Sequence, residues 1–166
     1  MRENLAEDDN YQIIKSEPAT DDDLLLICQK DYIDFTKEYY RAANLGLRLP
    51  GQFSRFHSVD NMPIGRPGRL EEAARLIVGQ AKMACKLIQA GMLKKVISIG
   101  GGLHHAKPSY GEGFCLYNDV AFCALYLMQQ QPAAGTIRHS DSLTSHIVFE
   151  RKVSATYRTV HPTRSN

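Results

Sequence analysis

Residues 70–102 constrain the fold more than any other part of this 166-residue chain, because they give three elements in a fixed order. Apolar residues recur with the helical repeat from Leu70 for about five turns, and Gly91 supplies a stop. Residues 94–99, KKVISI, have the length and composition of a buried parallel strand, and a triple glycine follows. This order predicts an α/β domain with its chemistry on the loop at the carboxyl end of the strand.

Two further helices are expected before this unit. Thr20 can cap a helix whose first turn holds Asp21, Asp22 and Asp23, carboxylates that the positive end of a helix dipole favours. A second helix is expected over residues 32–43. Residues 44–68 hold four of the twelve glycines and three of the seven prolines, which predicts a long loop with His57 at the surface.

After the glycine loop, an apolar segment is followed by a polar one. Asn118 or Asp119 can cap a helix over residues 120–128, which is apolar nearly all round and is expected to be buried. Residues 131–166 then contain ten Ser and Thr, against seven in residues 1–130, so a buried core does not continue easily into them. Short strands are conceivable there at residues 146–150 and 153–160. We therefore expect two parts, a domain over residues 1–130 and a divergent tail over residues 131–166, disordered or frameshifted.

Composition excludes several classes of partner. The formal charge of +2 is small and no run of Lys and Arg concentrates it, so no nucleic-acid partner is predicted. The acidic, polar beginning is unlike a signal peptide, and no apolar run approaches membrane-spanning length. The four cysteines form no CxxC pair and are expected to be reduced and mostly buried. These features predict a cytoplasmic protein without a membrane partner.

The adjacent pair His104 and His105 on the loop after the strand is the best candidate for chemistry. A histidine close to its neutral form can serve as a general base for hydrolysis. The alternative is that the pair only hydrogen-bonds its own loop. Cys115 could instead be a nucleophile activated by either histidine, although its apolar neighbours tend to raise a thiol pKa. A phosphate-binding loop is disfavoured, because no Lys-Ser/Thr pair follows the glycines.

Residues 97–119, ISIGGGLHHAKPSYGEGFCLYND, resemble the active-site loop of the zinc-dependent histone deacetylase family, which includes acetoin utilisation proteins and acetylpolyamine amidohydrolases. The shared order is Gly-Gly-Leu-His-His-Ala, then Gly-Phe-Cys, then Asn-Asp. Flanking segments match as well, so the resemblance extends over about residues 11–130. It implies a three-layer, parallel-sheet arginase/deacetylase-like domain, here with an incomplete set of strands.

The resemblance also implies roles for residues of this loop. The implied reaction is hydrolysis of an acetyl-lysine or acetylpolyamine amide by zinc-activated water, with His105 as general base and His104 as its electrostatic partner. Gly113 and Phe114 match positions that line the substrate channel, although a lone Phe is more often a core aromatic. The remaining matches belong to the active-site loop and are Gly101, Gly102, Cys115, Asn118 and Asp119.

Downstream the sequence departs from the family. Two zinc ligands of the family come from an Asp-x-Asp-x-His motif, a third from a later Asp, and a later Tyr polarises the substrate carbonyl. None is recognisable here. Arg138-His139-Ser140-Asp141 has a His-x-Asp in reversed order and lacks an apolar strand before it. We expect the front part of a deacetylase with an unrelated tail, as a frameshift, premature stop or partial gene would give.

The expected consequence is a truncated amidohydrolase that has no metal ligands of its own, binds no zinc and is inactive as this chain. The alternative is a non-catalytic fragment, or an interaction protein that depends on an oligomer or on a partner that completes the sheet. An incomplete parallel sheet exposes apolar edges and faces, so stability in isolation should be poor.

Overall fold

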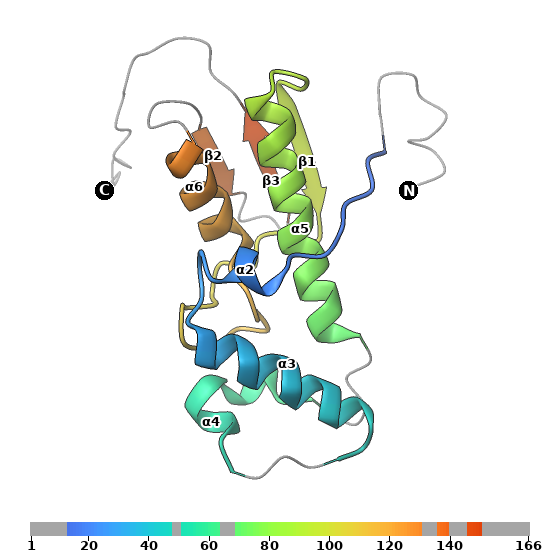
Figure 1. Cartoon of the computed structure of the whole chain (residues 1–166), viewed down its shortest axis with the longest axis vertical. Coiled ribbons are helices and arrows are strands. Elements are labelled where there is room, and N and C mark those ends of the chain that lie inside the picture. Colours follow the sequence, from blue (N-terminus) through green and yellow to red (C-terminus); the bar gives the residue numbers. More distant parts are fainter. Residues whose placement is uncertain (1–12, 48–50, 64–68, 131–135, 140–145, 151–166) are drawn as a thin grey trace, which may run out of the picture.

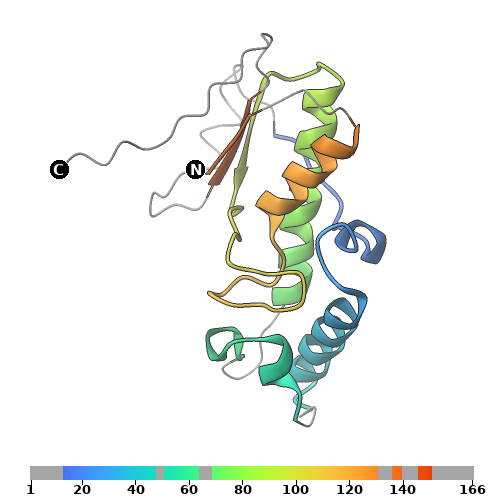
Figure 2. The same ribbon diagram turned by 90° about the vertical axis from the view of Figure 1, so that its left-hand side faces the viewer.

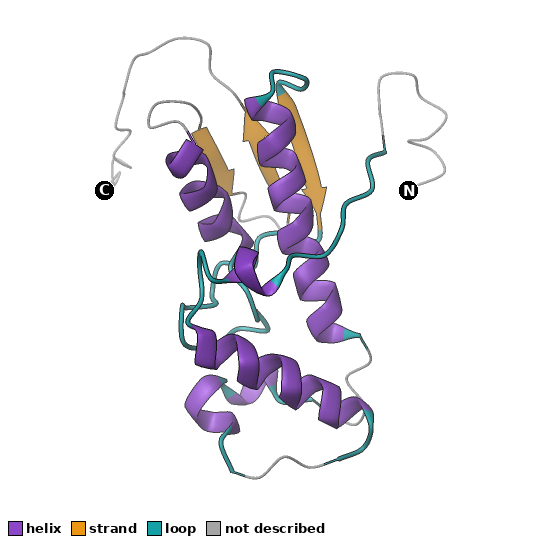
Figure 3. Cartoon of the chain, in the orientation of Figure 1, coloured by secondary structure: helices purple, strands orange, loops and turns teal. Residues whose placement is uncertain are grey.

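The computed structural model describes residues 13–47, 51–63, 69–130, 136–139 and 146–150 (Figure 1). A small sheet and two helices that pack against it, α5 (Leu70–Gln89) and α6 (Asp119–Gln130), make up one end of the molecule. The other end is helical and contains α3 (Lys30–Asn44) and α4 (Phe53–Phe56). Figure 3 shows that loops without regular structure join the two ends.

The first predicted helix begins where its capping residue predicts. Thr20 caps α2 (Asp21–Leu24) through a capping box, in which its hydroxyl accepts the Asp23 N–H and the Asp23 carboxylate accepts the Thr20 N–H. The second predicted helix is α3, which extends slightly beyond residues 32–43 at both ends. Its buried face carries Tyr32, Ile33, Thr36 and Tyr40 at helical spacing.

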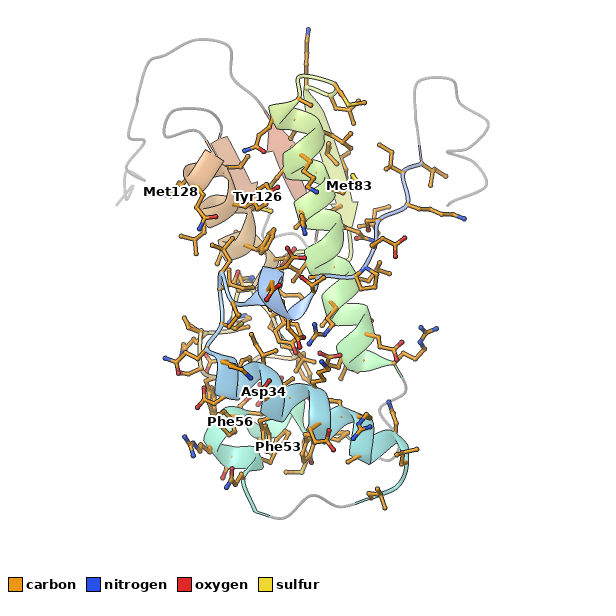
Figure 4. The ribbon with its side chains drawn as sticks, in the orientation of Figure 1. Asp34, Phe53, Phe56, Met83, Tyr126 and Met128 are labelled. Atoms are coloured by element: carbon orange, nitrogen blue, oxygen red, sulfur yellow. The ribbon has the colours of Figure 1, made fainter. Side chains whose placement is uncertain are left out.

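The predicted order of a helix, a strand and a glycine turn over residues 70–102 is confirmed. Helix α5 ends at Gln89, and β1 covers Lys95–Ile99. Helix α6 covers the predicted residues 120–128 and begins one residue earlier, at Asp119, but it is not buried all round. Phe122 and Cys123 are fully buried against α5, whereas Leu125 and Met128 on the other face are exposed. Figure 4 shows the Met128 side chain at the outer side of α6.

The sheet contains β1, β2 (Thr136–His139) and β3 (His146–Glu150) in the order β1-β3-β2. The expectation of parallel strands is wrong for these three, because both pairings are antiparallel. Only residues 140–145 separate β2 from β3, which is too few for the crossover of a dozen or more residues that parallel neighbours need. The predicted strand over residues 153–160 lies outside the described residues.

Strand β2 also changes the interpretation of the His-x-Asp sequence. We expected no strand before Arg138-His139, but Thr136–His139 is a strand that ends at this histidine. Its partner β3 confirms the short strand expected at residues 146–150. Asp141 lies outside the described residues. The polar tail therefore contributes backbone pairing to the sheet.

One face of the sheet is covered and the other is open among the described residues. Figure 2 shows the sheet nearly edge-on, with α5 and α6 on the same side of it. On β1, Ser98 is buried toward the helices, where its hydroxyl donates to Gln80, whereas Ile97 and Ile99 are 55% and 65% exposed. A three-layer domain has helices on both faces, so these strands present two of its layers.

The predicted long loop, residues 44–68, contains ordered structure that the glycine and proline pattern did not indicate. It holds α4 and the 3-10 helix η1 (Val59–Asn61). His57, expected at the surface, is 1% exposed, and that prediction is wrong. Aromatic rings from α3 and α4 enclose it, and we call this group the aromatic cluster: Tyr32, Phe35, Tyr39, Tyr40, Phe53, Phe56 and His57.

The aromatic cluster is closely packed. The rings of Phe35 and Phe56 stack with centroids 4.6 Å apart, and those of Tyr39 and Phe53 lie 4.8 Å apart. Figure 4 shows Phe53 and Phe56 extending from α4 beside α3. Offset aromatic contacts of this kind stabilise a core beyond the area they bury. They fix the short helix α4 on α3.

The four cysteines are free and buried, as expected. Within the described ranges, none of the helices has the length and apolar character required to cross a membrane.

Candidate active site

The loop after β1, residues 100–117, is here called the histidine loop. Gly100 and Gly102 adopt left-handed backbone with φ of 85° and 100°, a conformation that glycine tolerates, whereas the predicted Gly101 does not adopt it. The buried Asp119 carboxylate accepts the backbone N–H groups of Gly102 and Leu103, the latter at 2.7 Å. Asp119 thus fastens the start of the loop to the first residue of α6.

Asn118 fastens the middle of the loop to the same helix. Its side-chain NH₂ donates to the carbonyl oxygens of His104 and Ala106, both at 3.0 Å. Its side-chain oxygen accepts the N–H of Ala121 at 2.9 Å, so Asn118 is also the residue that caps α6. One residue therefore sets both the helix start and the position of the histidine backbone.

The two histidines lie side by side. Their ring centroids are 4.1 Å apart, and both residues are solvent-exposed. The Nδ1 atom of His104 lies 2.9 Å from the carbonyl oxygen of Gly102. The His105 ring lies directly against Gly113, where a Cβ atom would come within 2.8 Å of its Cγ. The loop thus brings three of the predicted site residues, His104, His105 and Gly113, together.

Phe114 is the second predicted channel residue and is 78% exposed, so it is not a core aromatic. It follows Gly113 in a four-residue turn that the Cys115 N–H closes onto the Glu112 oxygen at 2.9 Å. An exposed apolar ring that follows Gly113, the residue in contact with His105, suits a wall for the apolar stem of a substrate.

Cys115 does not have the surroundings of a nucleophile. It is 5% exposed, and its thiol donates to the Gly113 oxygen at 3.3 Å. Burial raises the pKa of the Cys115 thiol, which opposes formation of the reactive thiolate. The structure therefore disfavours the cysteine hydrolase alternative.

Several residues that hold the histidine loop were missed in the sequence. The Tyr32 hydroxyl donates to the Leu116 oxygen at 2.6 Å, and the Asn61 side chain donates to the Cys115 oxygen at 3.0 Å. The Asp60 carboxylate accepts the Gly113 N–H at 2.7 Å. These contacts span 53 to 84 residues, so no local periodicity could reveal them.

His57 was also missed, and the backbone beside it is hydrogen-bonded to the same loop. Its ring Nε2 lies 3.0 Å from the Thr36 hydroxyl, while its Nδ1 finds no hydrogen-bond partner among the described residues. The backbone on either side of His57 pairs with Gly111, through bonds of 2.8 Å from the Gly111 N–H to Phe56 and 2.9 Å from the Ser58 N–H to Gly111. Burial lowers the pKa of His57 to about 4, so it is neutral at physiological pH.

The part of the chain that the structure describes was compared with the needs of a zinc site. Among the described residues, no three His, Cys, Asp or Glu side chains lie close enough together to hold a metal ion. The Asp119 carboxylate is already engaged by backbone N–H groups of the loop. A catalytic zinc normally has three protein ligands, so this set does not fit one.

A cavity of about 650 Å³ lies away from the histidines, between α3 and the start of α5. Its cationic lining residues each pair with a carboxylate, as Lys37 does with Asp21 and Arg75 does with Glu71. None of the residues that line the cavity belongs to the histidine loop, and the cavity adds nothing to the site.

The sequence also matches proteins of a known family. The histone deacetylase domain matches residues 1–137. The chain belongs to the histone deacetylase family. The acetoin utilization protein AcuC of Staphylococcus aureus (strain COL) is 34% identical over 119 residues, and that of Staphylococcus xylosus is 35% identical over 120. These matches cover 72% of this chain and only 29% and 30% of the relatives, so the chain spans about a third of their length.

Solved structures of the family confirm the predicted fold class. A deacetylase homologue from Aquifex aeolicus superposes with a TM-score of 0.62 and 25% identity, over 78% of this chain and 33% of that one. A second structure, described as a deacetylase homologue complexed with SAHA, gives a TM-score of 0.63. The described residues thus form an incomplete arginase/deacetylase-like α/β domain, although their strands pair antiparallel.

Proposed function

We propose that this chain carries the proton-transfer part of a deacetylase-type amidohydrolase site, whose substrates are acetylated lysine side chains or acetylated polyamines. The observation that carries the proposal is the side-by-side pair His104 and His105, 4.1 Å apart, on a loop that Asn118 and Asp119 fasten to α6. Family membership supports the reaction class.

In the proposed reaction a water molecule attacks the amide carbonyl while a ring nitrogen of His105 accepts the water proton. That proton then passes to the departing amine nitrogen, and acetate and the free amine are the products. His104 stabilises the charge that His105 gains. Phe114 packs against the apolar stem of the substrate. Zinc, the metal of the family, polarises the carbonyl when bound, but this would require ligands beyond the described residues.

We further propose that the 166 residues alone hydrolyse acetyl amides poorly or not at all. The support comes from the sequence, since residues 131–166 contain no Asp-x-Asp-x-His. Metal analysis of the purified chain tests this directly. Stoichiometric zinc at micromolar or tighter affinity, or turnover of an acetyl-lysine peptide, would contradict it. Reading frames beyond codon 130 offer a second test, because an encoded apolar strand ending in Asp-x-Asp-x-His would indicate a disrupted deacetylase gene.

The histidine chemistry can be tested in a chimaera in which residues 11–130 replace the matching segment of the Staphylococcus aureus relative. We expect a folded, active chimaera. In it, His105→Gln should lower kcat by about 10²- to 10⁴-fold, the range for loss of a general base. Lys94→Ala, outside the loop, is the control. A folded chimaera that remains active with His105→Gln would overturn the proposal.

A second candidate function, a partner-dependent interaction protein, is favoured by the open face of the sheet, where Ile97 and Ile99 are exposed. The partner would cover this face and complete the domain. Gel filtration combined with hydrogen exchange tests it. A compact monomer with protected amides in β1 would count against a required partner.

We also propose that the protein resides in the cytoplasm. Four free, buried thiols suit a reducing environment, which favours the cytoplasm.

A further inference from the structure

The turn that supports His105 has an unusual backbone. Its two central residues, Gly113 and Phe114, have φ of 58° and 62°, and Phe114 is the one non-glycine residue with positive φ in the described part of the chain. Left-handed backbone at both central positions defines a type I′ turn. This conformation is strained for a residue with a side chain. Some contact must therefore hold Phe114 in this conformation.

The Cys115 N–H closes the turn onto Glu112, and Asp60 adds a contact to Gly113 from a distant part of the sequence. It lies in η1, and its carboxylate accepts the Gly113 N–H at 2.7 Å. This is a charge-assisted hydrogen bond to the first central residue of the turn. The same turn receives a second bond from η1, because the Asn61 side chain donates to the Cys115 oxygen.

The 3-10 helix is itself anchored on the helical end of the molecule. The Tyr40 hydroxyl donates to the Asn61 carbonyl oxygen at 2.5 Å, and both residues are buried. The neighbouring His57 is enclosed in the aromatic cluster. Asp60 is therefore an exposed carboxylate on a firmly held support.

The turn in its place determines where His105 can lie. Because Gly113 contacts the His105 ring more closely than any residue with a Cβ could, a shift of Gly113 would leave the imidazole without its support. The pKa of Asp60 is lowered chiefly by the Gly113 hydrogen bond, and the nearby His105 contributes to the same direction. The carboxylate thus lies within electrostatic reach of the imidazole.

We propose that Asp60 is a positioning residue for His105, which it fixes by holding Gly113 and Phe114 in the turn beneath the imidazole. The function assigned to the positioned imidazole rests on the proposed amidohydrolase activity. The positioning itself is a property of the chain alone, so the two can be tested separately.

The test is NMR spectroscopy of the isotopically labelled 166-residue chain and three variants. Asp60→Ala removes the acceptor, whereas Asp60→Asn keeps an oxygen that can accept the Gly113 N–H. Asp34→Ala is the matched control, because Asp34 is an exposed acid of α3 that pairs with Lys30 (Figure 4). The signals to follow are the Gly113 amide and the His105 ring, with amides of α5 as reporters of the fold.

In Asp60→Ala we expect the Gly113 amide to shift upfield and exchange faster with solvent, and the His105 ring signals to move. Asp60→Asn should restore both toward the original values, and Asp34→Ala should change neither. Rescue by Asn is the outcome that a general loss of stability would not produce.

The proposal is overturned if Asp60→Ala leaves Gly113 and His105 unchanged, or if Asp60→Asn behaves like Asp60→Ala while the α5 amides are retained. If Asp60→Ala unfolds the chain, Asp60→Asn decides. A folded Asn variant with a native Gly113 amide supports local positioning, and an unfolded one contradicts it.

The active chimaera adds a readout in turnover. There Asp60→Ala should lower kcat with little change in KM, and Asp60→Asn should recover much of the loss. Should His105→Gln prove harmless in the chimaera, the proposed function fails, but the NMR result on Asp60 stands or falls independently.

Discussion

The helical end of the molecule and the sheet differ in how completely they are packed. In the helical end, the centre of the aromatic cluster is enclosed, and Tyr32, Tyr40 and His57 are each 1% exposed or less, while Phe35, Tyr39 and Phe53 at its edge are partly buried. In the sheet, one face is covered by α5 and α6 and the other exposes Ile97 and Ile99. Beyond Gly100 the histidine loop is held by side chains of the helical end and of α6 rather than by the strands.

This difference explains how a site loop can keep its geometry on an incomplete sheet. The strand delivers the loop at Gly100, but beyond that point its position is set by α6, α3 and η1, through side chains such as Asn118, Tyr32 and Asp60. Loss of strands would leave these contacts in place. Catalytic loops are commonly held this way, by surrounding elements whose own side chains are fixed.

The largest expected effect comes from opening the aromatic cluster. Tyr32 is fully buried, contacts three other rings and donates to the Leu116 oxygen. Tyr32→Ala should lower the free energy of unfolding by about 3 to 5 kcal/mol, as for other large-to-small core changes. Tyr32→Phe, which removes the hydroxyl alone, should cost about 1 kcal/mol. Urea unfolding followed by circular dichroism measures both losses. A loss below 1 kcal/mol in the Ala variant would contradict the view that the helical end is more closely packed than the sheet.

The next largest effect is a pH dependence from His57. Burial lowers its pKa to about 4 in the folded chain, against about 6.5 unfolded. Between these values the unfolded chain binds a proton that the folded chain does not, so stability is present above pH 6.5 and is lost as pH falls toward 4. The loss should be on the order of 3 kcal/mol. Unfolding free energies across this window should fall less steeply in His57→Asn, and equal slopes would contradict the assignment.

A smaller loss of stability is expected from a substitution at Gly111. A Cβ there would lie 2.5 Å from the Nδ1 of His57, 2.6 Å from the Tyr32 hydroxyl and 2.8 Å from the Asn61 Nδ2. Gly111→Ala should therefore cost about 1 to 3 kcal/mol through overpacking. The His57→Ala substitution releases part of this space. The double variant should therefore lose less unfolding free energy than the sum of the losses in the two single variants. Strict additivity in urea unfolding would show that His57 is not the group in conflict.

The sequence predicted the sheet end and the histidine loop better than the helical end. Helix α5, β1 and the capping by Asn118 follow from periodicity and from residues close in sequence, so local patterns were enough. His57, Asp60 and Asn61 lie in a segment rich in glycine and proline, where burial comes from contacts far along the chain. Antiparallel pairing was missed because residues 146–150 indicate a short strand but neither its partner nor its direction, which are set by contacts far along the chain.

The smallest effect on stability should come from substitutions on the open face of β1. Ile97→Thr and Ile99→Thr keep a β-branched residue in the strand and remove apolar surface that is already more than half exposed. Each should change the free energy of unfolding by less than about 0.5 kcal/mol.

The same two substitutions should nevertheless reduce concentration-dependent association of the purified chain, because an exposed apolar sheet face promotes it. Sedimentation at several protein concentrations measures this, with Ser98→Thr on the covered face as control. A loss of stability comparable to that of Tyr32→Ala would mean that Ile97 and Ile99 are covered after all. The sheet would then be as closed as the aromatic cluster, and a partner would have nothing left to complete on this face.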